Sequence, residues 1–206
     1  MVRRSFFTIL TLILFGLFLT GCPKKVPMII PEKLPYENPI VKILDAFSSA
    51  DTLQAKASIR VDVIRNGEEM RFPTINGFVF YQKPDKLRIL GYSPFPIGAN
   101  LFDALYRNGE FFVLIVPQKK AYTGEVSEFE NLMEEADVQV SFQKPDGSQI
   151  PNWIRIEIKK KETSGELRLK DIILNNPLQE DIFQWVVPEG IEVKPLSQLL
   201  KGKRTR

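Results

Sequence analysis

Few residues in this 206-residue chain are of types that could do chemistry. It has no His and one Cys, so neither a Ser-His-Asp nor a Cys-His nucleophile can form, and a His-ligated zinc site and an internal disulfide are excluded. The densest carboxylate cluster is Glu128, Glu130, Glu134 and Glu135, and its spacing indicates a solvated helix face rather than a catalytic pair. We therefore expect no enzyme activity, no cofactor and no bound metal.

The one thiol, Cys22, lies where its chemistry can be assigned. Arg3 and Arg4 precede an uncharged, mostly apolar run that ends in Leu19-Thr20-Gly21-Cys22. This order is typical of a secretory signal with small residues at its cleavage site. The tetrapeptide resembles the lipobox of bacterial lipoproteins, in which the Cys is lipidated and becomes the first mature residue. The alternative is an uncleaved anchor, because the run reaches the lower limit of about 17 residues for crossing a bilayer.

We accordingly predict a signal peptide over residues 1–21 and a lipidated Cys with a tether over 22–38. Prolines recur at every fourth position from 23 to 39, which excludes a helix or a central strand. The tether either gives reach towards a partner or is only a spacer. Pro23 follows the Cys, where Asp is the usual inner-membrane retention signal of Gram-negative lipoproteins. The resemblance therefore implies an anchor at the periplasmic face of the outer membrane.

The folded part is predicted to span residues 39–195, with 196–206 as a basic tail. Apolar spacing of three and four residues predicts a helix that begins after Asn38 and ends near Phe47. A second helix is expected over 127–135, with Ser127 as N-cap and Glu130 completing a capping box. Small alanines at positions 55 and 57 leave room on one face of the sheet for a helix or a ligand.

Alternation and turn sequences predict about nine to eleven strands, mostly joined by hairpins. They are expected near residues 53–63, 70–81, 87–92, 101–106, 111–116, 138–142, 153–159, 166–174 and 183–187, with a short segment at 191–193. The strand at 111–116 is apolar on both faces and must be covered on both sides. The fold class is therefore mainly β, a curved antiparallel sheet closed wholly or partly, with short helices.

Several stretches resemble one family. They are the alternating strand that begins at Gln54, the segment Asn76–Arg88, the loop Pro94–Gly98 and the end Phe183–Val193. These are similar to the lipoprotein-localisation (LolA/LolB-like) family of periplasmic carriers and outer-membrane receptors, and the layout is nearest to the receptor. The resemblance implies an unclosed β-barrel with a helical lid around a cavity for acyl chains.

The resemblance also implies two groups of site residues, and the alternation of the strands adds a third. Phe95 or Ile97 corresponds to the receptor's exposed apolar loop residue, which contacts membrane or lipid; the alternative is that both fold back over the sheet edge. Lys83 stands where the carrier has an arginine that bonds to the lid, and lysine lacks the planar fork of donors. The predicted cavity lining, which could equally be a packed core, is Ile59, Val61, Phe78, Phe80, Leu87, Ile89, Val113 and Ile115.

The function that follows is binding of lipoprotein acyl chains by a monomeric, outer-membrane-anchored lipoprotein, which receives lipoproteins or other lipids and inserts them in the membrane. Its expected partners are these acyl chains, a LolA-like periplasmic carrier and the membrane that holds the lipid anchor. The net charge of +3 is too small to indicate nucleic acid. The alternative is an envelope lipoprotein that acts as a protein-interaction module without transport. A hydrolase is disfavoured, because no nucleophile–base pair is recognisable.

Overall fold

The structure, a computed structural model, describes residues 37–65, 67–95 and 97–199. The described residues all belong to one compact unit of the chain. The predicted signal peptide, Cys22 and nearly all of the tether lie outside the described residues.

Within the described residues, eleven strands form one sheet in the order β11-β7-β6-β5-β4-β3-β1-β10-β9-β8, with β2 paired to β1. The strand bounds are β1 Thr52–Arg65, β2 Glu68–Arg71, β3 Ile75–Gln82, β4 Lys86–Tyr92, β5 Asn100–Arg107, β6 Glu110–Ile115, β7 Lys120–Glu125, β8 Val138–Gln143, β9 Trp153–Ile158, β10 Thr163–Leu174 and β11 Glu192–Pro195. Every pairing is antiparallel except that of β11 with β7. Strands β8 and β11 are the two ends of this order, so the curved sheet is unclosed, as predicted.

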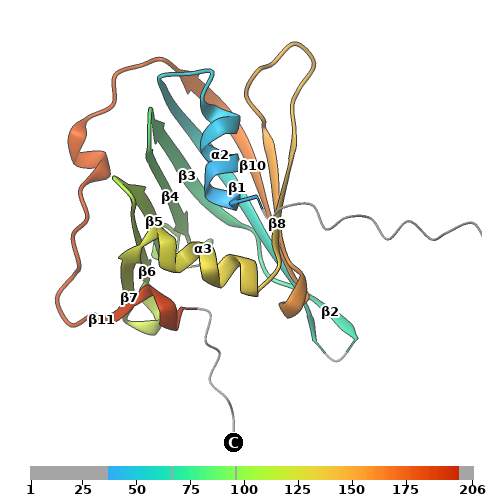
Figure 1. Ribbon diagram of the computed structural model, residues 1–206, viewed down its shortest axis with the longest axis vertical. Coiled ribbons are helices and arrows are strands. Elements are labelled where there is room, and N and C mark those ends of the chain that lie inside the picture. The colour runs from blue at the N-terminus through green and yellow to red at the C-terminus, as the bar shows by residue number, and fades with distance from the viewer. Residues whose placement is uncertain (1–36, 66, 96, 200–206) are drawn as a thin grey trace, which may run out of the picture. The chain divides into compact units, whose positions relative to one another are not determined.

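Two helices lie on the same side of the sheet (Figure 1). Helix α2 (Pro39–Phe47) begins as predicted, because the Asn38 side chain accepts a hydrogen bond from the Ile40 amide at 2.8 Å and Pro39 occupies the first turn. Helix α3 (Val126–Glu135) joins β7 to β8 and packs against β6, β7 and β8, so it spans the gap in the sheet. The side of the sheet that both helices cover is called the inner face below.

The predicted capping box of α3 is wrong. The N-cap is Glu125, and it makes no side-chain hydrogen bond to the helix. Ser127 lies inside the first turn, where its hydroxyl is 3.4 Å from the Glu125 carboxylate. Glu130 accepts a hydrogen bond from the Asn38 side chain instead, which ties α3 to the start of α2. The Glu130 carboxylate therefore makes a tertiary contact and does not cap its own helix.

Two predicted strands also differ. The segment 70–81 is divided into β2 and β3 by the residues around Pro73, which has no N–H to donate to the ladder. No strand forms at 183–187: Glu180–Phe183 is a short 3₁₀ helix, η3, within a long connection between β10 and β11. We call this connection, residues 175–191, the strap.

The strap crosses the outer face of the sheet. Arg107 donates a hydrogen bond to the Phe183 carbonyl at 2.6 Å, and the Phe112 and Trp185 rings lie 5.3 Å apart. Phe183 is buried, with 2% of its surface exposed. Strand β6 is therefore apolar on both faces because helix α3 lies on one side and the strap on the other, as the sequence predicts.

The folded part extends further than predicted at its C-terminal end. Leu196 begins a 3₁₀ helix, η4 (Leu196–Gln198), and its side chain is fully buried. The residues from Leu196 to Gln198 therefore belong to the folded domain and not to a basic tail. None of the helices in the described part of the chain is long and apolar enough to cross a membrane.

Candidate functional site

The inner face is apolar, and α2 packs on one part of it. The small residues Ala55 and Ala57 of β1 are buried and leave room for the helix. Phe47 of α2 contacts Tyr81 of β3, with ring centroids 5.7 Å apart. The fully or almost fully buried residues of this cluster also include Ile43, Ala50, Leu53, Val79, Leu87, Ile154 and Leu169. This part of the inner face is a packed core.

The rest of the inner face is only half-buried. Pairing of β1 with β3 and β10, of β3 with β4, and of β4 through β7 places a continuous set of apolar residues on this side. The half-buried members are Val61, Val63, Ile75, Ile89, Phe102, Val113 and Ile115. Apolar surface that keeps contact with water favours burial against another apolar group. This half-buried part is the candidate site.

Six of the eight residues predicted as cavity lining lie on the inner face. Ile59 and Leu87 belong to the packed cluster. The four half-buried ones are Val61, Ile89, Val113 and Ile115.

Phe78 and Phe80 were placed on the wrong face. Phe78 is opposite Lys56 of β1 and Leu90 of β4, which point away from the helices. The two Phe rings pack on each other at a centroid distance of 6.2 Å. Strand β3 is apolar on both faces, so alternation could not decide its orientation, and the smaller Val79 fits under α2.

Phe102 is a candidate residue that the sequence did not single out. It lies opposite Gly91 across the β4–β5 pair. A Cβ atom on Gly91 would stand 2.2 Å from the Phe102 ring, so the ring occupies the space above the glycine. An isolated glycine inside a strand pattern is the signal that could have revealed this close approach.

The loop between β4 and β5 holds Phe95 and Ile97 outward, with 86% and 91% of their surfaces exposed. Its base is closed by hydrogen bonds between Ser93 and Ala99 at 2.7 Å and between Gly98 and Ser93 at 3.2 Å. The Ser93 hydroxyl also accepts from the Phe95 amide at 3.0 Å and donates to the Phe95 carbonyl at 2.6 Å. The loop therefore does not fold back over the sheet; it presents both apolar side chains to solvent.

Lys83 contacts the covering helix. Its ammonium group donates to the carbonyl of Ser48, the C-cap residue of α2, at 3.1 Å. A cation at this end also interacts favourably with the helix dipole. The contact is solvent-exposed and consists of one hydrogen bond, in contrast to the forked contact that an arginine could make.

Two tyrosines under the helices, Tyr81 and Tyr106, have pKa values raised above the ordinary value of 10. Burial, followed by the nearby carboxylates of Asp85 and Glu130, raises the pKa of Tyr106. Burial is also the main reason that the pKa of Tyr81 is raised. Within the described residues no group of three or more acidic or thiol side chains could hold a metal ion. The inner face is thus suited to apolar contact.

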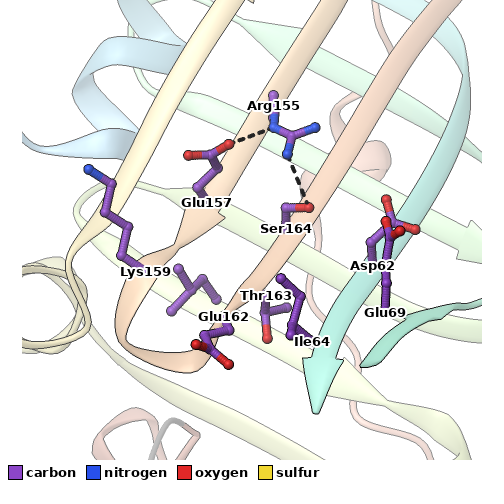
Figure 2. Close-up of a pocket in the computed structure, with 10 residues that line it drawn as sticks. Asp62, Ile64, Glu69, Arg155, Glu157, Lys159, Glu162, Thr163 and Ser164 are labelled. Carbon is purple, nitrogen blue, oxygen red and sulfur yellow. Dashed lines mark hydrogen bonds and ion pairs between the residues drawn. The ribbon is translucent and has the colours of Figure 1, made fainter. Parts of the chain in front are cut away.

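Two surface hollows lie apart from the candidate site, and the first reaches the inner face only at its edge strand β8, through Val140 and Phe142. A groove of about 740 Å³ between α2 and the edge strand β8 is lined by Glu37, Asn38, Val41, Lys42, Asp45, Ala46, Val140, Phe142 and Lys144. A smaller one of about 210 Å³ lies on the outer face (Figure 2). In the strand register there, Asp62 of β1 and Glu157 of β9 are each opposite Ser164 of β10. Two cations, Arg155 and Lys159, line this hollow, and Arg155 is already engaged by Glu157 at 2.7 Å and Glu166 at 3.0 Å. Neither hollow offers a continuous apolar wall.

No protein-family profile and no curated protein matches the sequence. The chain is similar to solved structures that include a LolA superfamily protein from Nitrosomonas europaea, which is 12% identical with a TM-score of 0.43 over 71% of this chain and 97% of that one. Another is an uncharacterized conserved protein from Thermus thermophilus, 12% identical with a TM-score of 0.42 over 75% and 98%. A third is the lipoprotein LppX from Mycobacterium tuberculosis, 12% identical with a TM-score of 0.35 over 68% and 94%.

The superfamily of the Nitrosomonas protein is the one that the sequence resembles. The likeness concerns the fold, and its identities and TM-scores do not transfer a function from these proteins to this chain.

Proposed function

We propose that this protein binds acyl chains on its half-buried inner face and passes lipidated cargo to a membrane. The observation that carries the proposal is the combination of a partly uncovered apolar face with a loop that exposes Phe95 and Ile97 almost completely. Binding and release make and break no covalent bond. The proposed cargo is a lipoprotein or another acylated molecule.

The energetics suit transfer rather than storage. An acyl chain that leaves water gains about 0.8 kcal/mol per buried CH₂ group, and the bilayer offers the same gain. On an inner face that α2 and α3 already half-cover, an acyl chain buries less of its surface and so gains less free energy than it does in the bilayer. Cargo can therefore pass on to the bilayer. Phe95 and Ile97 are proposed to enter the membrane and bring the inner face close to it.

The sequence adds the anchor to this proposal. Cys22 is proposed to carry the lipid that holds the protein at the periplasmic face of the outer membrane, and a LolA-like carrier is proposed to deliver the cargo. Mass spectrometry of the protein purified from cells tests the first part, with Cys22→Ala as control. An unmodified Cys22 would overturn the anchor while leaving the binding proposal open to its own test.

The binding test uses a fluorescent triacylated lipopeptide and the purified full-length protein. We expect saturable binding, and we expect Val113→Gln to weaken it, because the substitution puts an amide group on the apolar surface that the acyl chain covers, and an amide is costly to remove from water. Phe95→Glu should bind the lipopeptide normally and deliver it to vesicles more slowly. Val186→Glu, at a strap residue that is 73% exposed, is the matched control. Absence of lipopeptide binding would refute the proposal and favour a protein-interaction module.

A further inference from the structure

The β1–β2 hairpin exposes a second group of apolar side chains. Met70 and Phe72 have 40% and 49% of their surfaces exposed, and both lie on the same side of the hairpin as Val63 and Val61. Figure 1 shows that the hairpin projects beyond the rest of the sheet at one end. Exposed apolar side chains that gather at one place mark a contact surface more often than scattered ones do.

The hairpin and the β4–β5 loop leave the sheet at the same end. Tyr92, the last residue of β4, is opposite Asn76 at the start of β3. The residues before β3 continue the pairing with β1, since the Phe72 amide donates to the Val61 carbonyl at 3.1 Å. Ser93 and the loop that follows it therefore lie beside the segment that enters β3.

The apolar strip on the hairpin continues the inner face. Met70 is opposite Val63, and Phe72 bonds to the backbone of Val61, both of which are half-buried inner-face residues. Because residues that are directly opposite in a ladder share a face, apolar side chains run from Ile59 through Val61 and Val63 to Met70. The apolar surface of the inner face therefore does not end at the edge of the sheet but extends onto the hairpin.

Charge at this end does not indicate an electrostatic partner. Arg71 and Glu69 pair with each other at 3.2 Å, and the loop 93–99 contains no charged residue. The exposed lysines at positions 159, 160 and 161 are followed directly by the exposed Glu162. A stable protein interface needs about 800 Å² on each partner, which two narrow tips do not present as one continuous surface. A fluid lipid surface can accept such separate apolar tips without shape complementarity.

We propose that the β1–β2 hairpin is a second membrane contact, which acts with the Phe95–Ile97 loop to set the open end of the inner face against the bilayer. The inference rests on the proposed function and adds the path that acyl chains follow, along Val61, Val63 and Met70. The occupant of the hairpin surface is the interfacial region of a lipid bilayer.

The test is the depth of single labels in lipid vesicles. Cys22 is the only Cys of the chain, so in the lipidated full-length protein a Met70→Cys or Ile97→Cys substitution gives one free thiol for a fluorophore. The protein is reconstituted in phosphatidylcholine vesicles that contain doxyl-labelled lipid as quencher. Glu110→Cys is the control, because it is exposed at the start of β6, at the opposite end of the sheet from the loop.

We expect lipid quenching at positions 70 and 97 and none at 110. Quenching at 97 without 70 overturns the inference and leaves the loop contact of the proposed function standing. Quenching at 70 without 97 supports the hairpin contact and refutes the loop contact. A label at 70 that is shielded from water but not quenched by lipid would identify a protein or a second copy as the occupant, which also overturns the inference.

A pair of variants measures the consequence for transfer. Met70→Glu combined with Phe72→Glu should leave folding intact, since both side chains are already exposed, and should slow lipopeptide delivery to vesicles by about tenfold. Val186→Glu should not change the rate. If the double variant binds and delivers the lipopeptide as the unsubstituted protein does, the hairpin has no role in transfer. If the unsubstituted protein does not bind the lipopeptide at all, the proposed function itself is overturned.

Discussion

The two faces of the sheet are covered by different kinds of contact. On the outer face, Arg88 pairs with Asp103 at 2.5 Å and also donates to the strap carbonyls of Ile182 and Gln184. Asp103 is only 5% exposed, and no other charged side chain in the described residues is buried. On the inner face, α2 is held by apolar packing, by the hydrogen bond from Asn38 to Glu130 of α3 and by one exposed hydrogen bond from Lys83.

This difference indicates which cover can move. A buried polar network has one good geometry, because a misplaced charge without its partner is costly. Apolar contacts are not directional, so a helix can shift on them at small cost. Helix α2 has nine residues, too few to be stable alone, and its packing on the sheet is what maintains it. We infer that the strap is a fixed part of the fold and that α2 is the adaptable one, as a lid over a lipid site requires.

The largest expected effect comes from breaking the outer-face network. Asp103→Ala should lower the free energy of unfolding by about 3–5 kcal/mol, because it leaves the Arg88 guanidinium, whose side chain is only 17% exposed, without its counterion. Urea denaturation measures the change. The double variant Arg88→Met, Asp103→Leu should recover part of the loss. A decrease below about 1 kcal/mol for Asp103→Ala would mean that the pair behaves as a surface ion pair and that the strap is not fixed by it.

A smaller effect is expected on the inner face. Lys83→Met should lower the free energy of unfolding by at most about 1 kcal/mol, since it removes one solvent-exposed hydrogen bond. The same variant should speed amide hydrogen exchange in the last turn of α2 and leave exchange in the strap unchanged. Lys83→Arg keeps a donor and is the matched control. If amide hydrogen exchange were accelerated equally in the strap, α2 and the strap would not move independently, which contradicts the inference.

Much of the fold could be predicted because its signals are local. The Asn38–Pro39 helix start and the alternation in β1 follow from capping and from period-two burial. The errors occur where a distant partner decides. Glu130 bonds to Asn38, which is 92 residues away in the chain, and does not cap its own helix. The segment 183–187 is part of the strap because the carbonyls of Phe183 and Gln184 accept hydrogen bonds from Arg107 and Arg88.

The candidate site was predicted less completely than the fold. The loop of Phe95 and Ile97 was identified from its composition, but whether it pointed outward depended on hydrogen bonds at its base. Phe78 was assigned to the wrong face because a strand that is apolar on both sides carries no orientation signal. Phe102 was missed because its place above Gly91 depends on the register between β4 and β5.

The smallest expected effect tests why Asp103→Ala is expected to be so destabilising: because the Arg88–Asp103 pair is buried, or only because it is an ion pair. Lys56 and Asp171 form another ion pair of the sheet, at 2.8 Å, but both side chains are 65% exposed. The hydrogen bond from Lys56 lowers the pKa of Asp171 below its usual 3.8, and the same bond raises the pKa of Lys56 above 10.5. The pair's contribution is therefore lost as the pH falls through the lowered pKa of Asp171 or rises through the raised pKa of Lys56.

Asp171→Asn tests this pair without backbone strain, because Asn also tolerates the left-handed conformation at φ 50°. Denaturation at neutral pH should show a decrease in stability that is barely measurable in low salt and disappears in high salt, where exposed charges are screened. In acid, where Asp171 is protonated, variant and wild type should be equally stable. A loss as large as that of Asp103→Ala, or one that persists in acid, would show that ion pairing alone stabilises the sheet. Burial beneath the strap would then no longer distinguish the outer-face network from an ordinary surface contact.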